Sequence, residues 1–381
     1  MDAMTPVGRG WSAALPQGVE GPSCIPDGIR VMSSSHVHEL GCPGPWVDNL
    51  VSSTGSERKA PRVLIDVGAN KGYMIAEFLS LWRPQNSTPS AAAWNRAIRQ
   101  WAAEHGSHAL RQRSCGECGD CKRKAQPPAQ RSLSWPGTSF SDDVVVHALE
   151  LVEDNRHLLR SIIDRFGLSA SVQVHNLAAS NETRTMFLPR RYAAGAEKAE
   201  LLQGQSAANA NTSVAVSVVD LDSFIASQGL GLHSIYQITV DTEGHDPLVL
   251  EGLRRTIQRR AVTLLQFEVG KKGYWNKAHP ERRRLNVTAA WLHAAGYECF
   301  FETHSALVPF SGPCWQPHYD GTASRKWANV LCTHEPSMAQ QLYSMAWAAY
   351  HVRTANINAT RGLRGTHGTS RGAAAAPRGR A

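Results

Sequence analysis

The chain of 381 residues contains 42% hydrophobic and 19% charged residues, a balance typical of a globular protein. Its length indicates two domains, or one large domain with additions. The sequence has no run of eighteen apolar residues, which excludes a membrane-spanning helix. Most of the net charge of +8 comes from the last part of the chain, so the charge alone does not indicate a nucleic-acid-binding protein.

The two ends of the chain differ in composition from the rest. Residues 1–60 are rich in Gly, Pro and Ser and predict an irregular N-terminal leader. They start without the basic and apolar stretches of a secretory signal, which favours a cytoplasmic protein. A helix is expected over 336–352, followed by a disordered Arg/Gly/Ala tail over 353–381. The arginines of this tail leave a contact with nucleic acid open.

Residues 61–335 alternate between strand and helix patterns. Strands are expected at 62–67, 143–149, 171–175, 234–240, 261–269, 297–302 and 327–332. Helices are expected at 72–82, 153–166, 247–259 and 281–295, and a small hairpin within 181–218. This alternation predicts an α/β fold with a mostly parallel sheet and helices on both faces. Only a loop separates the last two strands, which therefore predict an antiparallel edge.

One segment interrupts this alternation. Between residues 83 and 141 no strand occurs where one is due, and we interpret the segment as an insertion. Trp94, Ile98 and Trp101 follow helical spacing and predict an amphipathic helix in it. The insertion leaves and rejoins the fold at the ligand end of the sheet, so we expect it to form a lid.

The sequence VLIDVGANKGYM, residues 63–74, is a buried strand followed by a glycine-rich turn and a helix. Such a turn lies at the carboxyl end of a parallel sheet, where ligands bind. Nicotinamide enzymes carry G-x-G-x-x-G there, whereas this chain has Asn70 and Tyr73 at the second and third glycine positions. A phosphate-binding G-x-x-x-x-G-K-[ST] loop is absent from the sequence. A ligand without phosphate therefore suits the turn better.

S-adenosylmethionine is a ligand of this kind. Its amino group requires an acid, which Asp66 supplies, and its ribose requires another, which Glu150 supplies after the second strand. Gly68 would let the ligand come close, and Asn70 with the next helix would hold the ligand carboxylate. The predicted cofactor-binding residues are Asp66, Gly68, Asn70, Gly72, Glu150, Asn176 and Asp241.

Several motifs then occur in order over residues 61–333. They are D-V-G-A-N-K-G (66–72), A-L-E (148–150), H-N-L-A-A-S (175–180), V-V-D-L-D-S-F (218–224), V-D-T-E-G-H-D-P-L-V-L-E-G (240–252), Q-F-E (266–268) and G-Y-E-C-F (296–300). Together they resemble the FkbM family of S-adenosylmethionine-dependent methyltransferases, and the D-x-E-G-x-[DE] block is the most specific of them. The resemblance implies a Rossmann-like seven-stranded methyltransferase sheet and, usually, O-methylation.

The acidic residues after the fourth strand are the catalytic candidates. Methyl transfer needs alignment in a dry site, and a hydroxyl acceptor needs help in losing its proton. We predict Asp241 near the methyl group, with Glu243 or His245 acting on the nucleophile. Glu268 is expected in the same cleft, where with Asp241 it offers a weaker alternative, a Mg²⁺ site. In the competing interpretation, Glu243 and His245 only cap the following helix, alongside Asp246.

Three of the eight cysteines are clustered. Cys115, Cys118 and Cys121 form C-x₂-C-x₂-C and predict a structural zinc site, with free thiols or a local disulfide as the alternative. The fourth ligand would be His105, His108, Cys24 or Cys42.

The remaining five cysteines have no spacing that suggests a disulfide framework, which favours a reducing compartment. Five Asn-x-Ser/Thr sequons point the other way, because they matter only in a secreted chain. Their asparagines are Asn86, Asn181, Asn211, Asn286 and Asn358.

The sequence thus predicts an S-adenosylmethionine-dependent methyltransferase that O-methylates a small molecule or a glycan. A methyltransferase acting on protein or nucleic acid is the second interpretation, favoured by the tail and by the basic run 122–124. A non-catalytic binding module with the same fold is the third. The intact residues Asp66, Gly68, Glu150 and Asp241 argue against that third interpretation.

Overall fold

The computed structural model describes residues 24, 62–82, 88–115, 144–197, 199, 201, 211–230, 235–276, 278–303, 307–323 and 327–347. The leader apart from Cys24, the cysteines Cys118 and Cys121, and the predicted tail lie outside the described residues. None of the described helices has the length and apolar character needed to cross a membrane.

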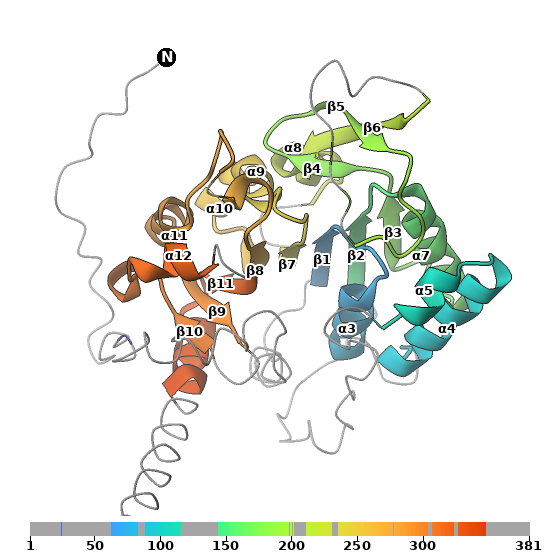
Figure 1. The fold of residues 1–381 in the computed structure, drawn as a ribbon. Coiled ribbons are helices and arrows are strands. Elements are labelled where there is room, and N and C mark those ends of the chain that lie inside the picture. The colour runs from blue at the N-terminus through green and yellow to red at the C-terminus, as the bar shows by residue number, and fades with distance from the viewer. Residues whose placement is uncertain are drawn as a thin grey trace, which may run out of the picture.

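The large sheet has eight strands in the order β10-β9-β11-β8-β7-β1-β2-β3 (Figure 1). Its parallel part consists of β1 (Arg62–Val67), β2 (Val144–Leu149), β3 (Val172–His175), β7 (Ile235–Val240) and β8 (Val262–Val269). The antiparallel part consists of β9 (Glu298–Glu302), β10 (Leu307–Pro309) and β11 (Ala328–Thr333). The α/β fold and the mostly parallel sheet are therefore confirmed.

Two details of the sheet differ from the prediction. An eighth strand, β10, pairs with β9; its three residues are too few to give a strand pattern in the sequence. The antiparallel strand β11 lies between β8 and β9 rather than at an edge. The chain order alone does not reveal this position, because β9 precedes β11 in the sequence.

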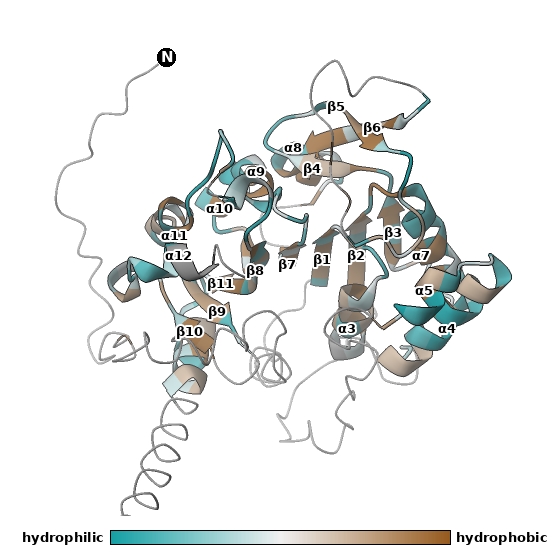
Figure 2. Ribbon diagram, viewed as in Figure 1, coloured by the Kyte–Doolittle hydropathy of each residue, from teal (hydrophilic) through white to brown (hydrophobic). Residues whose placement is uncertain are grey.

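Helices cover both faces of the large sheet. One face packs against α3 (Tyr73–Trp82), α4 (Ala91–Glu104), α7 (Glu153–Arg165) and the helical residues 336–347. The other packs against α8 (Leu221–Ser227), α9 (Asp246–Gly252), α10 (Arg254–Gln258) and α11 (Leu285–Ala294). Leu64 belongs to the first core and its neighbours Val63 and Ile65 to the second, as alternation along a strand requires. The strands are accordingly hydrophobic, and α4 carries polar residues (Figure 2).

A second sheet of three strands follows β3. It contains β4 (Ala178–Ser180), β5 (Arg184–Pro189) and β6 (Ser213–Asp220), in the order β4-β6-β5. The predicted hairpin is the antiparallel pair β5–β6, and β4 joins it in parallel. This small sheet has its own apolar core, which includes Met186, Leu188 and Val218.

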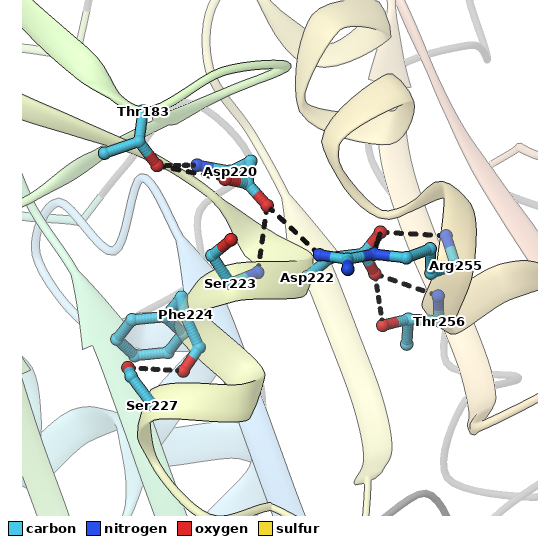
Figure 3. A network of polar contacts seen from close by, with 8 residues as sticks. All are labelled: Thr183, Asp220, Asp222, Ser223, Phe224, Ser227, Arg255 and Thr256. Atoms are coloured by element: carbon cyan, nitrogen blue, oxygen red, sulfur yellow. Dashed lines mark hydrogen bonds and ion pairs between the residues drawn. The ribbon is translucent and has the colours of Figure 1, made fainter.

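Two aspartates, Asp220 at the end of β6 and Asp222 in α8, hold the starts of α8 and α10 (Figure 3). Asp220 caps α8, because its carboxylate accepts the N–H of Ser223 at 2.9 Å. Asp222 instead reaches the start of α10, where it accepts the N–H groups of Arg255 at 2.8 Å and Thr256 at 2.9 Å. The helix predicted over 247–259 is two helices, α9 and α10. Asp222 accepts the free N–H groups at the start of the second.

The first helix of the insertion is part of the core and not a lid. In α4 the side chain of Trp94 is fully buried and stacks on Phe166, with 5.9 Å between ring centroids. Its indole N–H donates to the backbone carbonyl of Lys71 at 2.8 Å. The short α5 (His108–Gln112) follows and buries Leu110. The expectation of a lid is wrong for this part of the insertion, because α4 packs against α3 and α7 and buries Trp94 and Trp101 there.

The cysteines form disulfides, against the expectation from their spacing. Cys24 bonds Cys314, and Cys299 bonds Cys332. Cys299 and Cys332 lie directly opposite each other on β9 and β11, a pairing set by strand register and not visible in the sequence. The basis for a reducing compartment is thereby removed.

Candidate functional site at the glycine turn

The glycine turn joins β1 to α3 in a left-handed conformation. Gly68, Asn70 and Gly72 have φ values of 87°, 47° and 77°. A Cβ atom on Gly68 would lie 2.0 Å from the backbone oxygen of Asp241. Gly68 is therefore required for the close packing of β1 against the end of β7, in addition to any approach to a ligand. Asn is among the few residues besides glycine that tolerate the conformation of residue 70.

Glu150 holds this turn from the end of β2. Its carboxylate accepts the N–H of Asn70 at 2.7 Å and the N–H of Val152 at 2.7 Å. The side chain is buried, and burial raises its pKa to about 7 even though the N–H groups of Val152 and Asn70 act in the opposite direction. The structure thus brings the predicted residues Asn70 and Glu150 together.

A segment that sequence analysis did not single out crosses the turn. We call residues 194–197 the strap. The carbonyl of Ala196 accepts from the amides of Asn70 at 3.4 Å and Asn155 at 3.2 Å. Glu197 forms an ion pair with the buried Lys71. No sequence pattern marks the strap, because it lies in an irregular stretch after β5.

A cavity of about 260 Å³ opens between the glycine turn, the strap and the ends of β7 and β8. We call it the carboxylate cavity. Its lining includes the acids Asp66, Glu150, Asp241, Glu243 and Glu268. Lys272 pairs with Glu243 and Lys71 with Glu197. Within the described residues, no cation lies within ion-pair distance of Asp66, Glu150, Asp241 or Glu268. Carboxyl groups in the cavity therefore outnumber the cations paired with them.

The crowding of these acids raises their pKa values. Burial raises the pKa of Asp66 to about 7, and the charge of Glu150 adds to it. Burial and the charge of Asp241 raise the pKa of Glu268 to about 9. Asp241 is accessible from the cavity but surrounded by protein, and this desolvation, with the charges of Asp246 and Glu243, raises its pKa well above the ordinary value. Such displaced pKa values are frequent at functional sites.

One oxygen of Asp66 has no hydrogen-bond partner among the described residues. The side chain is buried, and its Oδ2 atom lacks any hydrogen bond. A buried carboxylate oxygen without a donor is costly, so a donor from outside the chain is expected there. Asp66 belongs to the lining of the carboxylate cavity.

The side chains of the D-T-E-G-H-D block make different kinds of contact. Asp246 is fully buried and accepts the N–H groups of Gly244 at 3.0 Å and Glu268 at 3.2 Å, so it fixes the turn. Glu243 has a φ of 55°, an unfavourable value for glutamate, and its carboxylate pairs with Lys272. Neither Glu243 nor His245 is seen to cap α9 through its side chain.

His245 faces a second cavity of about 400 Å³, which adjoins the first. We call it the apolar cavity, since it is lined largely by leucines and alanines, including Leu149, Leu151 and Leu177. The Nε2 atom of His245 lies 2.9 Å from Ser180 Oγ. Burial, with the positive charge of Arg184, lowers the pKa of His245 to about 4, so the ring is neutral at neutral pH.

Of the other predicted cofactor-binding residues, Gly72 lies at the glycine turn and Asn176 lies away from both cavities. Gly72 packs against Leu159 and Trp94, and a Cβ there would lie 2.6 Å and 2.8 Å from their side chains. Asn176 is exposed and lines neither cavity. Residues that the sequence did not indicate, such as Lys272 and Trp327, line the carboxylate cavity.

The zinc prediction is not supported. Cys115 is disulfide-bonded, so it has no free thiolate for a metal. Its partners in the motif, Cys118 and Cys121, lie outside the described residues. Among the residues that the structure covers, no three His, Cys, Asp or Glu side chains are grouped to hold a metal, so the Mg²⁺ alternative also lacks support.

Residues 139–299 match the sequence model of the Methyltransferase FkbM domain. This part of the chain is similar to FkbM methyltransferase domains. The match begins at β2 and ends within β9, so it includes Glu150, the D-T-E-G-H-D block and Glu268. The resemblance drawn from the motifs is thereby confirmed, and the glycine turn lies just before the matched segment.

Solved structures give weaker likenesses. Methyltransferase FkbM from Methylobacillus flagellatus is 12% identical with a TM-score of 0.38, over 78% of this chain and 50% of that one. The chain thus spans half the length of the Methylobacillus protein. The putative tRNA (m1A22) methyltransferase Sp1610 of Streptococcus pneumoniae is 12% identical with a TM-score of 0.26, over 76% and 69%. The human methyltransferase 10 domain containing protein is 9% identical with a TM-score of 0.27, over 79% and 81%. A search of curated proteins finds no match.

Proposed function

We propose that the chain is an S-adenosylmethionine-dependent methyltransferase that methylates a hydroxyl group of a small molecule or glycan. The observation that carries this proposal is the excess of buried carboxylates beside the glycine turn. S-adenosylmethionine has a positive sulfonium and a positive ammonium group but one carboxylate, so it is a net cation. A cavity with four acids and no paired cation among the described residues suits such a ligand.

Individual residues fit the groups of this cofactor. The partnerless Oδ2 of Asp66 would accept a hydrogen bond from the ammonium group. Glu150 would accept from a ribose hydroxyl, next to the N–H groups that it already binds. Asp241 and Glu268 lie at the ends of β7 and β8, where the positive sulfonium would favour their ionised forms. When bound, the cofactor supplies a methyl group on a cationic sulfur.

Asp241 is the residue to which we assign proton removal from the acceptor. It is open to the cavity and its pKa is raised, so its carboxylate is a stronger base than an ordinary one. Glu243 is neutralised by Lys272, and His245 lies toward the apolar cavity with a lowered pKa. These two residues are less suited to the role that the sequence suggested.

The far side of the carboxylate cavity favours a polar acceptor. Thr239, Gln266 and Asn329 contribute hydroxyl and amide groups, and Trp327 contributes an aromatic surface. Hydrogen-bonding groups beside an aromatic ring suit a hydroxyl-rich ligand such as a sugar better than an apolar one. The basic run and the arginine tail, which favour protein or nucleic acid as acceptor, lie outside the described residues.

Two measurements test this function. Titration calorimetry with S-adenosylhomocysteine should show binding that Asp66→Asn weakens at least tenfold, while NADH gives no heat of binding. The surface variant Glu153→Gln, which removes the same charge from an exposed site, should bind like the wild type. Binding of NADH instead of S-adenosylhomocysteine would overturn the cofactor assignment.

Transfer of a labelled methyl group should then be measured against mono- and oligosaccharides, peptides and RNA. Labelling of a sugar hydroxyl, with kcat reduced about 100-fold or more in Asp241→Asn, is the expected result. Labelling of RNA or peptide alone would favour the second interpretation. Cofactor binding without transfer to any class would favour a binding module.

A further inference from the structure

The sequons and the cysteines take no part in the proposed methyl transfer. Three sequon asparagines lie in the described residues, namely Asn181, Asn211 and Asn286, and all three are exposed. Two disulfides hold the same chain. We propose that Asn286 and Asn211 are N-glycosylation sites of a chain that folds in an oxidising compartment.

The first observation is the state of the cysteines. Every cysteine that the structure describes is disulfide-bonded, including Cys115, whose partner lies outside the described residues. Cys299 and Cys332 are completely buried, so their bond is shielded from reductants in solution. Disulfides of this structural kind persist in the secretory pathway and are rare where thiols are kept reduced.

The second observation is the position of Asn286. It lies in the first turn of α11, and its neighbour Val287 is 61% exposed, the one large hydrophobic side chain in the described residues with such exposure. No residue of α11 lines the carboxylate cavity or the apolar cavity. A glycan on Asn286 would therefore project into solvent, cover Val287 and leave the candidate active site open.

Asn211 is independent of Asn286 in the fold. It lies in the turn that leads into β6 of the small sheet, and its side chain is exposed. In Asn181 the amide nitrogen donates to Glu251 at 3.1 Å, unlike that of Asn286. Asn286 is thus the clearest acceptor, and Asn211 is included because its side chain is exposed.

The chemistry of both modifications balances with components of such a compartment. The Nδ2 atom of asparagine bonds the anomeric carbon of a lipid-diphosphate-linked oligosaccharide; the carbon–oxygen bond to the diphosphate breaks, and the amide loses one proton. In each disulfide two thiols lose two protons, and their two electrons reduce the disulfide of a thiol oxidoreductase.

The test uses the full-length protein isolated from the cells that make it. Deglycosylation by a peptide N-glycosidase in oxygen-18 water should convert Asn286 and Asn211 to labelled aspartate, and omission of the enzyme should leave both unlabelled. Mapping under non-reducing conditions should recover the peptide pairs joined by Cys24–Cys314 and Cys299–Cys332.

Matched variants of Thr288, expressed in the same cells, separate glycosylation from a local structural effect. Thr288→Ser keeps the sequon and should keep the glycan, whereas Thr288→Ala should lose it and migrate faster by one glycan. An unmodified Asn286 in the isolated protein, or free thiols at Cys299 and Cys332 after alkylation, would overturn the proposal.

Discussion

The side-chain amide of Asn155 binds two backbone groups of the strap. Its Oδ1 accepts the N–H of Gly195 at 2.6 Å, and its Nδ2 donates to the carbonyl of Ala196 at 3.2 Å. Asn155 is 1% exposed and belongs to α7. Through it, the helix after β2 fixes the segment that covers the glycine turn. Asn155 is thus a positioning residue for the candidate cofactor site.

Removal of this amide should loosen the strap. We expect Asn155→Ala to weaken binding of S-adenosylhomocysteine about tenfold, since two hydrogen bonds of about 1 kcal/mol each are lost near the ligand. A positioning role predicts a higher KM for S-adenosylmethionine with little change in kcat. The control is Gln100→Ala, an exposed amide on α4. Equal loss of affinity in both variants would argue against the role of the strap.

The raised pKa of Asp66 predicts how stability changes with pH. An unfolded aspartate titrates near 3.8 but the folded one near 7, so between these values the folded state holds the additional proton. The free energy of unfolding without cofactor should therefore fall as pH rises through this window, by at most about 1.4 kcal/mol per pH unit for one group. Asp66→Asn lacks this contribution. Urea unfolding at pH 5 and pH 8 should show a smaller decline for the variant.

Binding of a cation should release protons from the same acids. At neutral pH Glu268, with a pKa of about 9, is protonated, and a positive ligand nearby favours its ionised form. Calorimetry in buffers of different ionisation enthalpy should detect more protons released with S-adenosylmethionine than with S-adenosylhomocysteine, which lacks the sulfonium charge. Equal proton release for both ligands would place the sulfonium away from Glu268.

Asp222 should contribute more to stability than its neighbour Asp220. Asp222→Ala removes the acceptor of two backbone N–H groups and of the Thr256 hydroxyl, and we expect a loss of about 2–3 kcal/mol in the free energy of unfolding. Asp220→Ala removes a single backbone cap of α8 and should cost about 1 kcal/mol. Denaturant unfolding of both variants tests the order, and the reverse order would contradict the assignment.

The Cys299–Cys332 disulfide should stabilise the antiparallel part of the sheet. The bond joins residues 33 apart in sequence, and loop-closure entropy predicts about 3–4 kcal/mol for a loop of this size. The double variant Cys299→Ala, Cys332→Ala should lose at least this amount. Reduction of the wild-type protein provides the comparison. A wild type that is unaffected by complete reduction would show that the bond adds little.

The predicted site residues that the structure brings together share one property: they stand at the carboxyl ends of buried strands. Asp66, Glu150 and Asp241 end β1, β2 and β7, and neighbouring parallel strands bring their carboxyl ends together. The hydrophobic runs before them identify those strands unambiguously. The motif order then sufficed to indicate the resemblance to the FkbM family, and residues 139–299 match that family's sequence model.

The errors have a different physical origin. The strap, the disulfide pairs and the position of β11 all depend on contacts between segments far apart in sequence. Sequence analysis assigned His245 to the acceptor site because of its place in the D-T-E-G-H-D motif. In the structure Glu243 has a left-handed conformation, and His245, which follows in the turn, lines the apolar cavity. Asn155 gave no signal, because a buried polar residue on an amphipathic helix resembles an exposed one in sequence.

The contact between Trp94 and the glycine turn also constrains how this protein can change in evolution. The ring occupies the space next to Gly72, and its indole N–H satisfies the carbonyl of Lys71. A helix of the segment that interrupts the strand–helix alternation thus completes the support of the glycine turn. Loss of the insertion would leave a buried carbonyl without a donor and a void beside the turn. Descendants of this chain are therefore expected to retain α4 even where the residues that follow it diverge freely.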